Sequence, residues 1–392
     1  MEHTAAIHLD KMQAITSQVQ YENDGLFGGK LGVVWQYYYQ WQATHEYAHK
    51  EECLRVLGEV FDNLNNDTPQ LSGAAMSVGA AGFCYVVTML HRQKWLEFDL
   101  DETLADLDTF AYESALEMIT ERKLDFWHGA FGILFYFLER LSNPLFRERA
   151  EVLVQKIVDE VQGDDDGLWF PNILSPQDET VINLSLSHGQ TAFMIILMQA
   201  AQKGVQAELA RSVVRRGVNF ILKHQRTANQ ETDFSLFPLT LTAETEEGKF
   251  SNRLALCYGD LNILLLMYRA AAFLESPELR RRADLCGVST LRRQTEKATL
   301  VSDSRLCHGA AGVAHLYHTL YKLTGNDGYY RNYQTWIDKT IAFLDHDLQH
   351  ETFKGQEGSL LNGYVGVQLV LLGYIYHKRE QLDWAKVFLL AP

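Results

Sequence analysis

Gly129-Ala130-Phe131-Gly132-Ile133-Leu134-Phe135-Tyr136-Phe137-Leu138 joins a short glycine turn to an almost wholly apolar run. The same arrangement recurs along the chain, with first glycines 50, 50, 60, 70, 50 and 54 residues apart. Each interval has room for a second helix that returns the chain to the same end of the molecule. A period of this size is typical of a repeat architecture. The seven turns are Gly29-Lys30-Leu31-Gly32, Gly79-Ala80-Ala81-Gly82, Gly129-Ala130-Phe131-Gly132, Gly189-Gln190-Thr191-Ala192, Gly259-Asp260-Leu261-Asn262, Gly309-Ala310-Ala311-Gly312 and Gly363-Tyr364-Val365-Gly366.

The helices that follow these turns are predicted to be buried on every face, because their sequences are apolar all round. The intervening segments 146–162 and 207–224 place apolar residues on one side only, which is typical of outer helices. We therefore predict an all-α fold, an α/α toroid of seven inner and seven outer helices. It would form a single domain over residues 1–392, without a clear inserted domain. An open solenoid has the same local pattern but needs atypical capping repeats, and the first and last turns resemble the others.

Residues 226–251 form the main irregular stretch, with Pro238 and the acidic run 244–247, and they account for the 70-residue interval. We expect a surface loop beside the entrance of the site, with disorder as the alternative. No βαβ pattern and no strong hairpin pattern is found.

The net charge and the number of cysteines limit the classes of function that this chain can have. The formal net charge of −15 opposes nonspecific binding to nucleic acid or anionic membranes. No apolar segment approaches the roughly 20 residues that span a bilayer, and no secretory signal is visible at the N-terminus. Five cysteines, an odd number, do not form a disulfide framework. Reduced thiols and a cytoplasmic location are expected.

Two turns carry cysteine beside the glycine, as Cys257-Tyr258-Gly259 and Cys307-His308-Gly309. These turns would be neighbours in a toroid. Cys257, Cys307 and His308 together make a zinc set that leaves one of four tetrahedral positions open, as in catalytic sites. A thiol that entered this position would lose its proton. The remaining cysteines are interpreted as small buried apolar residues: Cys53, Cys84 and Cys286.

Other polar residues lie at the same turns. His188 precedes Gly189 as His308 precedes its own glycine, and it is a candidate general acid or base. Asp125 and Arg253 are candidates to hold His188 in position and to stabilise a developing enolate. His128 also precedes a turn glycine, and its role is open between supporting the site, contacting substrate and a structural contact.

Four motifs resemble the lanthionine synthetase C-like family, the lantibiotic cyclases. Arg253-Leu254-Ala255-Leu256-Cys257-Tyr258-Gly259 and Leu306-Cys307-His308-Gly309-Ala310-Ala311-Gly312 are the specific ones. Asp125 with Trp127-His128-Gly129, and Ser187-His188-Gly189, accompany them. The resemblance covers essentially the whole chain, because the family is a seven-repeat α/α toroid. Leu256 stands where many members have tryptophan, and the fourth and fifth turns lack their second glycine.

This resemblance implies a function. Cys257, Cys307 and His308 would be the ligands of one zinc ion per chain. His188 and Asp125 would form the acid/base pair, and Arg253 and Tyr258 would line the reacting centre. The family's reaction is the addition of a peptide cysteine thiol to a dehydroalanine or dehydrobutyrine of the same peptide, which forms a lanthionine or methyllanthionine thioether. The partners would be a dehydrated precursor peptide, a separate dehydratase and an exporter. No dehydratase-like region precedes the toroid, as expected for the standalone type.

Three alternatives stay open at this point. A non-enzymatic zinc-dependent binder of thiols such as glutathione, or of peptides, would share the zinc set. A glycosidase needs two facing carboxylates, for which Asp125 and Asp260 are the available acids. A prenyltransferase-like subunit also uses a zinc-bound thiol, but its ligand set typically includes an aspartate. The joint presence of His188, Asp125 and Arg253 favours the cyclase.

Overall fold

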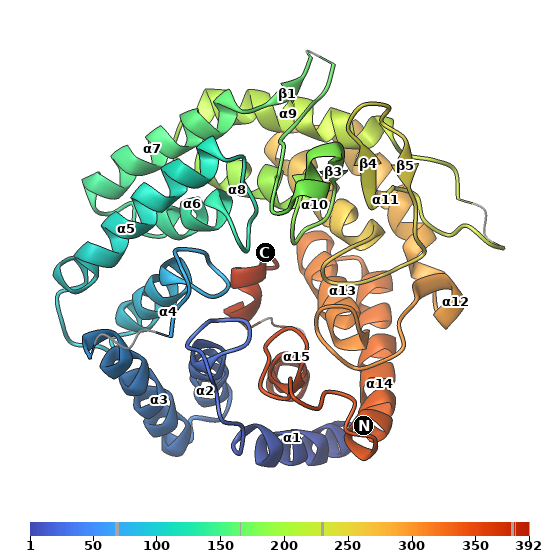
Figure 1. Cartoon of the computed structure of the whole chain (residues 1–392). Coiled ribbons are helices and arrows are strands. Elements are labelled where there is room, and N and C mark those ends of the chain that lie inside the picture. The colour runs from blue at the N-terminus through green and yellow to red at the C-terminus, as the bar shows by residue number, and fades with distance from the viewer. Residues whose placement is uncertain (67–69, 165, 229–230, 378–379, 381, 392) are drawn as a thin grey trace. The chain divides into compact units, whose positions relative to one another are not determined.

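The computed structural model describes residues 1–66, 70–164, 166–228, 231–377, 380 and 382–391, which are mostly helical (Figure 1). The chain divides into two compact units. Unit 1 comprises Met1–Ser72, Leu254–Leu256 and Gln294–Pro392, and unit 2 comprises Gly73–Arg253 and Cys257–Arg293. No described helix has the length and apolar character that a membrane crossing requires. The expectation of a single domain stays a prediction.

Each of the seven predicted turn glycines is the N-cap of an apolar helix, so the inner helices begin where the sequence indicates. Burial on every face is seen most fully in α6, all of whose residues are buried. The inner helices are α2 (Lys30–Thr44), α4 (Ala80–Arg92), α6 (Ala130–Leu138), α8 (Gln190–Gln202), α10 (Asp260–Phe273), α13 (Ala310–Thr324) and α15 (Tyr364–Tyr376).

Unit 2 alternates these inner helices with amphipathic outer ones. The inner helices pack against one another in the order α4, α6, α8, α10, and each also packs against the outer helix that follows it (Figure 1). The predicted apolar stripe of segment 146–162 is confirmed at Leu153, Val154 and Ile157, which are buried. The outer helices are α5 (Leu100–Thr120), α7 (Pro144–Asp159), α9 (Ala207–Lys223) and α11 (Pro277–Leu291).

Unit 1 has the same two kinds of helix, but one pair is made from the two ends of the chain. Inner helix α2 packs against α3 (Tyr47–Asn65), and α13 packs against α14 (Asp327–Gln349). The partner of α15 is α1 (Glu2–Thr16). The last inner helix is therefore covered by the first helix of the sequence. Unit 1 also contains α12 (Glu296–Thr299) and η2 (Asp383–Phe388).

Glycine begins the inner helices because the backbone of the preceding loop passes too close for a side chain. The N–H of Ala130 donates to the carbonyl of Lys123 at 3.1 Å, which closes the turn before α6. A Cβ on Gly129 would then lie 2.2 Å from that carbonyl oxygen. At Gly259 the backbone conformation requires glycine, since its φ of 103° strains residues that carry a side chain.

Short strands in unit 2 depart from the sequence analysis, which found no strong hairpin pattern. β1 (Gln162–Gly163) pairs with β2 (Leu168–Trp169), and β4 (Thr240–Thr242) pairs with β5 (Gly248–Lys249). β3 (Val181–Asn183), which follows η1 (Pro176–Thr180), adds to the outer edge of β4. The described part of the predicted loop 226–251 is thus partly a hairpin; residues 229 and 230 lie outside the described residues. Strands of two or three residues are too short to leave a period in the sequence.

Candidate functional site

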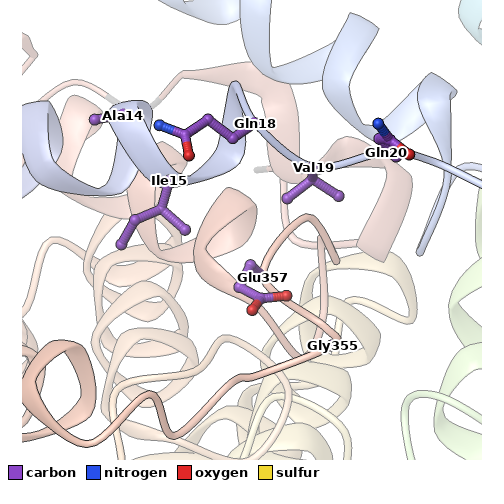
Figure 2. Close-up of a pocket in the computed structure, with 7 residues that line it drawn as sticks. All are labelled: Ala14, Ile15, Gln18, Val19, Gln20, Gly355 and Glu357. Carbon is purple, nitrogen blue, oxygen red and sulfur yellow. The ribbon is translucent and has the colours of Figure 1, made fainter.

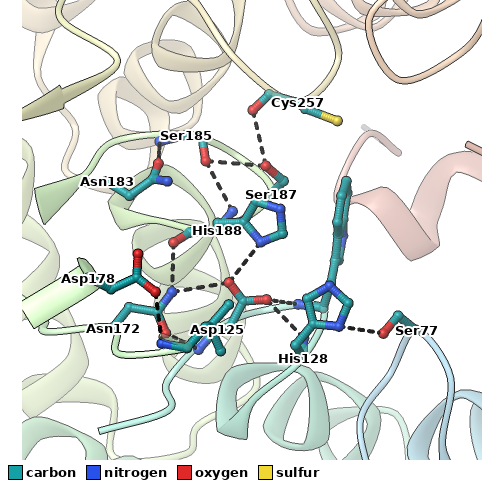
Figure 3. Close-up of polar contacts among 12 residues, drawn as sticks. Ser77, Asp125, His128, Asn172, Asp178, Asn183, Ser185, Ser187, His188 and Cys257 are labelled. Atoms are coloured by element: carbon teal, nitrogen blue, oxygen red, sulfur yellow. Dashed lines mark hydrogen bonds and ion pairs between the residues drawn. The ribbon is translucent and has the colours of Figure 1, made fainter. Parts of the chain in front are cut away.

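Asp125 lies in the turn that precedes α6 and is fully buried. Its Oδ1 accepts the backbone N–H groups of Trp127 and His128, both at 2.8 Å. Its Oδ2 accepts from Asn172 Nδ2 at 3.1 Å and lies 2.9 Å from Nδ1 of His188 (Figure 3). The carboxylate thus holds its own turn together with one oxygen and faces the histidine with the other.

His188 lies in the corresponding turn before α8, with its side chain 24% exposed. Its backbone N–H donates to Ser185 Oγ at 3.0 Å. A carboxylate only accepts hydrogen bonds, so Nδ1 carries a hydrogen in the contact with Asp125. The sequence predicted that Asp125 and His188 lie at turns at the same end of the fold, and the structure brings their side chains into direct contact.

Asn172 is a member of this site that the sequence analysis missed. Its Nδ2 donates both to Asp125 Oδ2 and to the backbone carbonyl of His188, at 3.1 and 3.0 Å. Its Oδ1 accepts the backbone N–H of Asp125 at 2.9 Å. One amide therefore locks the two turns together (Figure 3). It lies in an irregular segment between β2 and η1, outside any repeat position, so no spacing pointed to it.

His128, whose role was open, is part of the same cluster. Its ring stacks on that of His188, with centroids 5.7 Å apart and an interplanar angle of 11°. Its Nδ1 lies 2.9 Å from Ser77 Oγ. Burial lowers the pKa of His128, against the charge of Asp125, and the neighbouring His188 lowers it further. Ligand atoms of Asp125, His128 and His188 lie within 4.8 Å of one another. Hydrogen bonds within the cluster and to Ser77 hold these side chains in place.

A chain of hydroxyl groups joins the His188 turn to the Cys257 turn. Ser185 Oγ lies 3.2 Å from Ser187 Oγ, and Ser187 Oγ donates to the backbone carbonyl of Cys257 at 3.4 Å (Figure 3). Cys257 itself is 1% exposed. The predicted cysteine and the predicted acid/base residue therefore sit on turns that are hydrogen-bonded to each other.

Tyr258 is half-buried beside His188, with ring centroids 6.4 Å apart. Burial raises the pKa of its phenol, a hydrogen bond with Ser187 lowers it, and the charge of Asp125 raises it. The phenol therefore keeps its proton at neutral pH and can donate a hydrogen bond. Arg253 is half-buried, and its backbone N–H donates to Ser251 Oγ at 3.3 Å. Its proposed contact with the reacting centre stays a prediction.

Cys307 and His308 lie in unit 1, in the turn that begins α13. Cys307 is 6% exposed, His308 is half-buried, and their ligand atoms lie within 4.8 Å of each other. The backbone of Cys307 is fixed on both sides. Its N–H donates to the carbonyl of Leu361 at 2.9 Å, and its own carbonyl accepts from Leu256 N–H at 3.1 Å. These two residues could hold a metal ion.

His188 and Tyr258 line a pocket of about 210 Å³ in unit 2, together with Asn172, Asp178 and Asn183. A larger groove of about 500 Å³ lies in unit 1, between the end of α1 and the loop before α15 (Figure 2). Gln18, Gln20 and Glu357 supply its polar side chains. None of the predicted site residues lines this groove. Of the predicted site residues, His188 and Tyr258 line the smaller pocket.

The carboxylate of Asp260, the second acid of the glycosidase alternative, is bound by other groups of the protein. It is 2% exposed, pairs with Arg293 Nη1 at 2.6 Å and accepts the backbone N–H groups of Leu236 and Phe237. Burial raises its pKa, and these partners lower it. The carboxylate fixes the 236–237 segment on the start of α10 rather than lining the pocket of His188, which argues against a carboxylate pair.

The fold is an α/α toroid. A solved structure, "Nisin cyclase", matches 99% of this chain and 97% of its own chain with a TM-score of 0.78 at 17% sequence identity, and its fold is an α/α toroid. A crystal structure of D-mannose isomerase matches 70% of this chain and 73% of its own with a TM-score of 0.42 at 12% identity. The prediction of an α/α toroid is confirmed.

The family follows from the sequence itself. The model of the lanthionine synthetase C-like protein family matches residues 20–389, and the chain belongs to this family. No curated protein gives a match. The resemblance expected from the four motifs is therefore confirmed. The roles of individual site residues stay predictions.

Proposed function

We propose that this protein is a zinc-dependent lanthipeptide cyclase. Membership of the lanthionine synthetase C-like family and the fold shared with nisin cyclase support this proposal. The main support is the contact of His188 with the buried Asp125. The turn that carries His188 is also hydrogen-bonded, through Ser187, to the turn of Cys257. A protein that only bound thiols would have no need of a histidine oriented by a carboxylate.

The proposed donor set fits zinc. Cys257 and Cys307 are buried cysteines, and His308 adds an imidazole; with these three as ligands, one tetrahedral position would be left for substrate. Leu256 directly precedes Cys257 and donates its N–H to the carbonyl of Cys307, which supports assigning both cysteines to one metal. When bound, zinc would lower the pKa of an incoming thiol so that it is ionised at neutral pH.

His188, oriented by Asp125, would deliver the proton that the α-carbon of the substrate takes up. The peptide's thiol sulfur bonds to the β-carbon of a dehydroalanine or dehydrobutyrine, the carbon–carbon double bond becomes single, and the α-carbon takes up a proton. The thiol proton leaves to a base, so one proton is lost and one is gained. Nε2 of His188, left free by the Nδ1 contact with Asp125, is the group proposed to deliver the proton. Asp125 keeps the ring oriented and stabilises its charged form.

Arg253 and Tyr258 are proposed to stabilise the negative charge that develops on the amide oxygen of the substrate as the thiol adds. The neutral phenol of Tyr258 can donate to this oxygen from the wall of the His188 pocket. The substrate would be a dehydrated precursor peptide made by a separate dehydratase, and an exporter is proposed to act after cyclisation. Cys53, Cys84 and Cys286 are buried free thiols, in keeping with the proposed reducing, cytoplasmic setting.

A cyclisation assay tests the proposal. The purified, zinc-loaded protein is incubated with a synthetic peptide that carries one dehydroalanine and one cysteine. Ring closure leaves the mass unchanged, so free thiols are counted by alkylation before mass spectrometry. We expect the protein to remove the free thiol faster than buffer does, and His188→Ala to lose this activity while it keeps its zinc. Normal cyclisation by His188→Ala would contradict the acid/base assignment.

The non-enzymatic alternative has a different signature in the same assay. A zinc-dependent binder of thiols or peptides would retain the peptide, measured by fluorescence anisotropy of a labelled copy, without consuming its thiol. That outcome, repeated over several ring sizes, would replace the cyclase by the binding protein.

A further inference from the structure

We propose that the free edge of β3 binds the backbone of the substrate peptide and guides it to His188. The inference rests on the proposed function in taking a peptide as the substrate. β3 lies at the edge of its sheet, in the order β3-β4-β5. It is also the strand whose residues Val181 and Asn183 line the pocket of His188 and Tyr258.

The register of the sheet decides which backbone groups face outward. Leu184 N–H donates to the carbonyl of Leu239 at 3.0 Å, and Ala243 N–H donates to that of Thr180 at 2.9 Å. In an antiparallel pair the bonded residues alternate. Residues 180, 182 and 184 therefore turn their backbone groups toward β4. Val181 and Asn183 turn theirs toward the opposite side, where the described part of the chain places no strand beside β3.

Two of these outward groups are available. The C=O of Val181 and the N–H of Asn183 have no hydrogen-bond partner among the residues that the structure describes. The N–H of Val181 is already used, because it donates to the carbonyl of Asp178. A carbonyl and an N–H two residues apart on one edge can bind one residue of a parallel extended chain with two hydrogen bonds. An antiparallel chain placed opposite Val181 would require the occupied Val181 N–H, whereas a parallel chain uses the two available groups, so we expect the peptide to run parallel to β3.

Three polar side chains that line the pocket, those of Asn172, Asp178 and Asn183, are already hydrogen-bonded within the protein, so the peptide would be bound by the backbone edge of β3. Asp178 Oδ2 accepts from Leu174 N–H, Ser175 N–H and Ser175 Oγ, within its own loop. Asn183 Oδ1 accepts Ser185 N–H at 2.9 Å, and Asn172 is bound to the Asp125 and His188 turns. These polar side chains are therefore committed to holding the site in shape (Figure 3).

Size and location favour a peptide as the occupant. The pocket of about 210 Å³ lies below the usual range for a small-molecule ligand, roughly 300–1,000 Å³. His188 and Tyr258 form another part of its wall, so a chain paired with β3 has its next residues beside the proposed reacting centre. Backbone pairing also tolerates different side chains in the bound peptide.

Hydrogen exchange tests the proposal without turnover. The probe is a synthetic peptide with one dehydroalanine and with serine in place of cysteine, so that it binds but cannot cyclise. We expect it to slow exchange of the Asn183 amide by about tenfold, the effect of one added hydrogen bond. The Leu184 amide, which is already bonded to β4, is the internal control and should change little.

N-methylated probes supply the matched comparison. A methyl group on the one peptide N–H that pairs with Val181 C=O should restore exchange of Asn183 and, in the cysteine-containing peptide, raise KM with little change in kcat. Methylation of the N–H at the next position, which faces away from β3, should do neither. A uniform effect of methylation along the peptide would contradict pairing with this edge.

The outcomes separate this inference from the proposed function. Protection of Asn183 without any cyclisation of the cysteine peptide would sustain the docking edge and remove the cyclase. Cyclisation with an unprotected Asn183 would sustain the cyclase and overturn the docking edge. Protection that depends on protein concentration, without peptide, would assign the edge to a second copy of this chain. If no dehydrated peptide binds, both are overturned.

Discussion

Nδ1 of His188 lies 2.9 Å from Oδ2 of Asp125, in a carboxylate that accepts three further hydrogen bonds. The two residues are 63 positions apart in sequence and lie on the turns that begin α6 and α8. The same relationship orients catalytic histidines in unrelated enzymes, where the carboxylate fixes the tautomer and stabilises the charged ring.

Asp125→Asn tests this relationship with little change in shape. The amide can turn its NH₂ toward His188 and disfavour the tautomer with hydrogen on Nδ1. We expect the cyclisation rate to fall on the order of 10²- to 10⁴-fold, the usual contribution of acid–base catalysis, with zinc content unchanged. Asp106→Asn, an exposed aspartate on α5, is the control and should keep the wild-type rate. An equal fall in both variants would point to a general loss of stability.

Asn172→Ala addresses the amide that locks the two turns together. The variant loses the hydrogen bonds to the Asp125 carboxylate, the Asp125 N–H and the His188 carbonyl. Since Asn172 is proposed to position His188, kcat should fall by at least tenfold while KM changes little. A purely structural role would lower the melting temperature and the fraction of active protein, and leave kcat per active site unchanged. Active-site titration separates the two results.

The metal set is tested by elemental analysis. We expect one zinc per purified wild-type chain, and its loss in Cys307→Ala and in Cys257→Ala together with loss of cyclisation. Cys286→Ala is the matched control, because this thiol is also buried and free but belongs to α11. Equal metal binding by wild type and Cys257→Ala would remove Cys257 from the set. No zinc in the wild type after reconstitution would leave a toroidal binding scaffold.

Asp108 on α5 makes stability depend on pH. It is 3% exposed, and burial raises its pKa to about 6, although a hydrogen bond from Tyr136 and the charge of Arg140 lower it. A raised folded-state pKa means that the neutral acid is favoured by folding. The stabilisation from the neutral Asp108 carboxyl is complete below its pKa in the unfolded chain, near 3.8. This stabilisation is lost as pH rises through the folded-state pKa of about 6.

The measurement is urea unfolding at several pH values, comparing wild type with Asp108→Asn. The difference in unfolding free energy should shift by up to about 3 kcal/mol between pH 4 and pH 7, in favour of the variant at the higher pH. Asp106→Asn, exposed on the same helix, should show no such shift. A pH-independent difference for Asp108→Asn would show that its carboxyl titrates as in the unfolded chain.

The toroid was predictable because its determinants are local and repeated. A glycine before an apolar run specifies where each inner helix begins, and α6 is apolar and buried over its whole length. The pairing of α15 with α1 was not visible, because contacts between chain ends leave no period. One of the two turns without a second glycine, the turn of Asn262, is also explained. Asn262 replaces it and its Oδ1 accepts Leu186 N–H at 3.2 Å, so the side chain ties α10 to the neighbouring turn.

The candidate site also contains residues that the sequence could predict and residues that it could not. Asp125, His188, Cys257, Cys307 and His308 stand at or near the repeated turns, so the position of each one at a helix start could be anticipated. Asn172 and the edge of β3 could not be found in this way. Asn172 lies in an irregular segment, and β3 has only three residues; the place of each is fixed by hydrogen bonds to residues far along the chain, such as Asp125 and those of β4.

The turn glycines give a last test that connects the fold to the site. In Gly129→Ala the new Cβ would lie 2.2 Å from the carbonyl oxygen of Lys123 and 2.6 Å from the N–H nitrogen of Asp125. The turn must shift, and we expect a loss of roughly 1–3 kcal/mol in unfolding free energy. Because Asp125 moves with the turn, cyclisation should fall even under conditions in which the variant is fully folded.

Gly58→Ala is the matched variant, because Gly58 lies within outer helix α3 and nothing is found within 4 Å of the position of its added Cβ. Alanine has a higher helix propensity and a less flexible unfolded chain, so stability should rise by about 0.5–1 kcal/mol. Activity should stay at the wild-type level, since α3 carries none of the proposed site residues. Equal destabilisation of the two variants would show that helix-wide flexibility, rather than the close approach at the Asp125 turn, requires glycine in this chain.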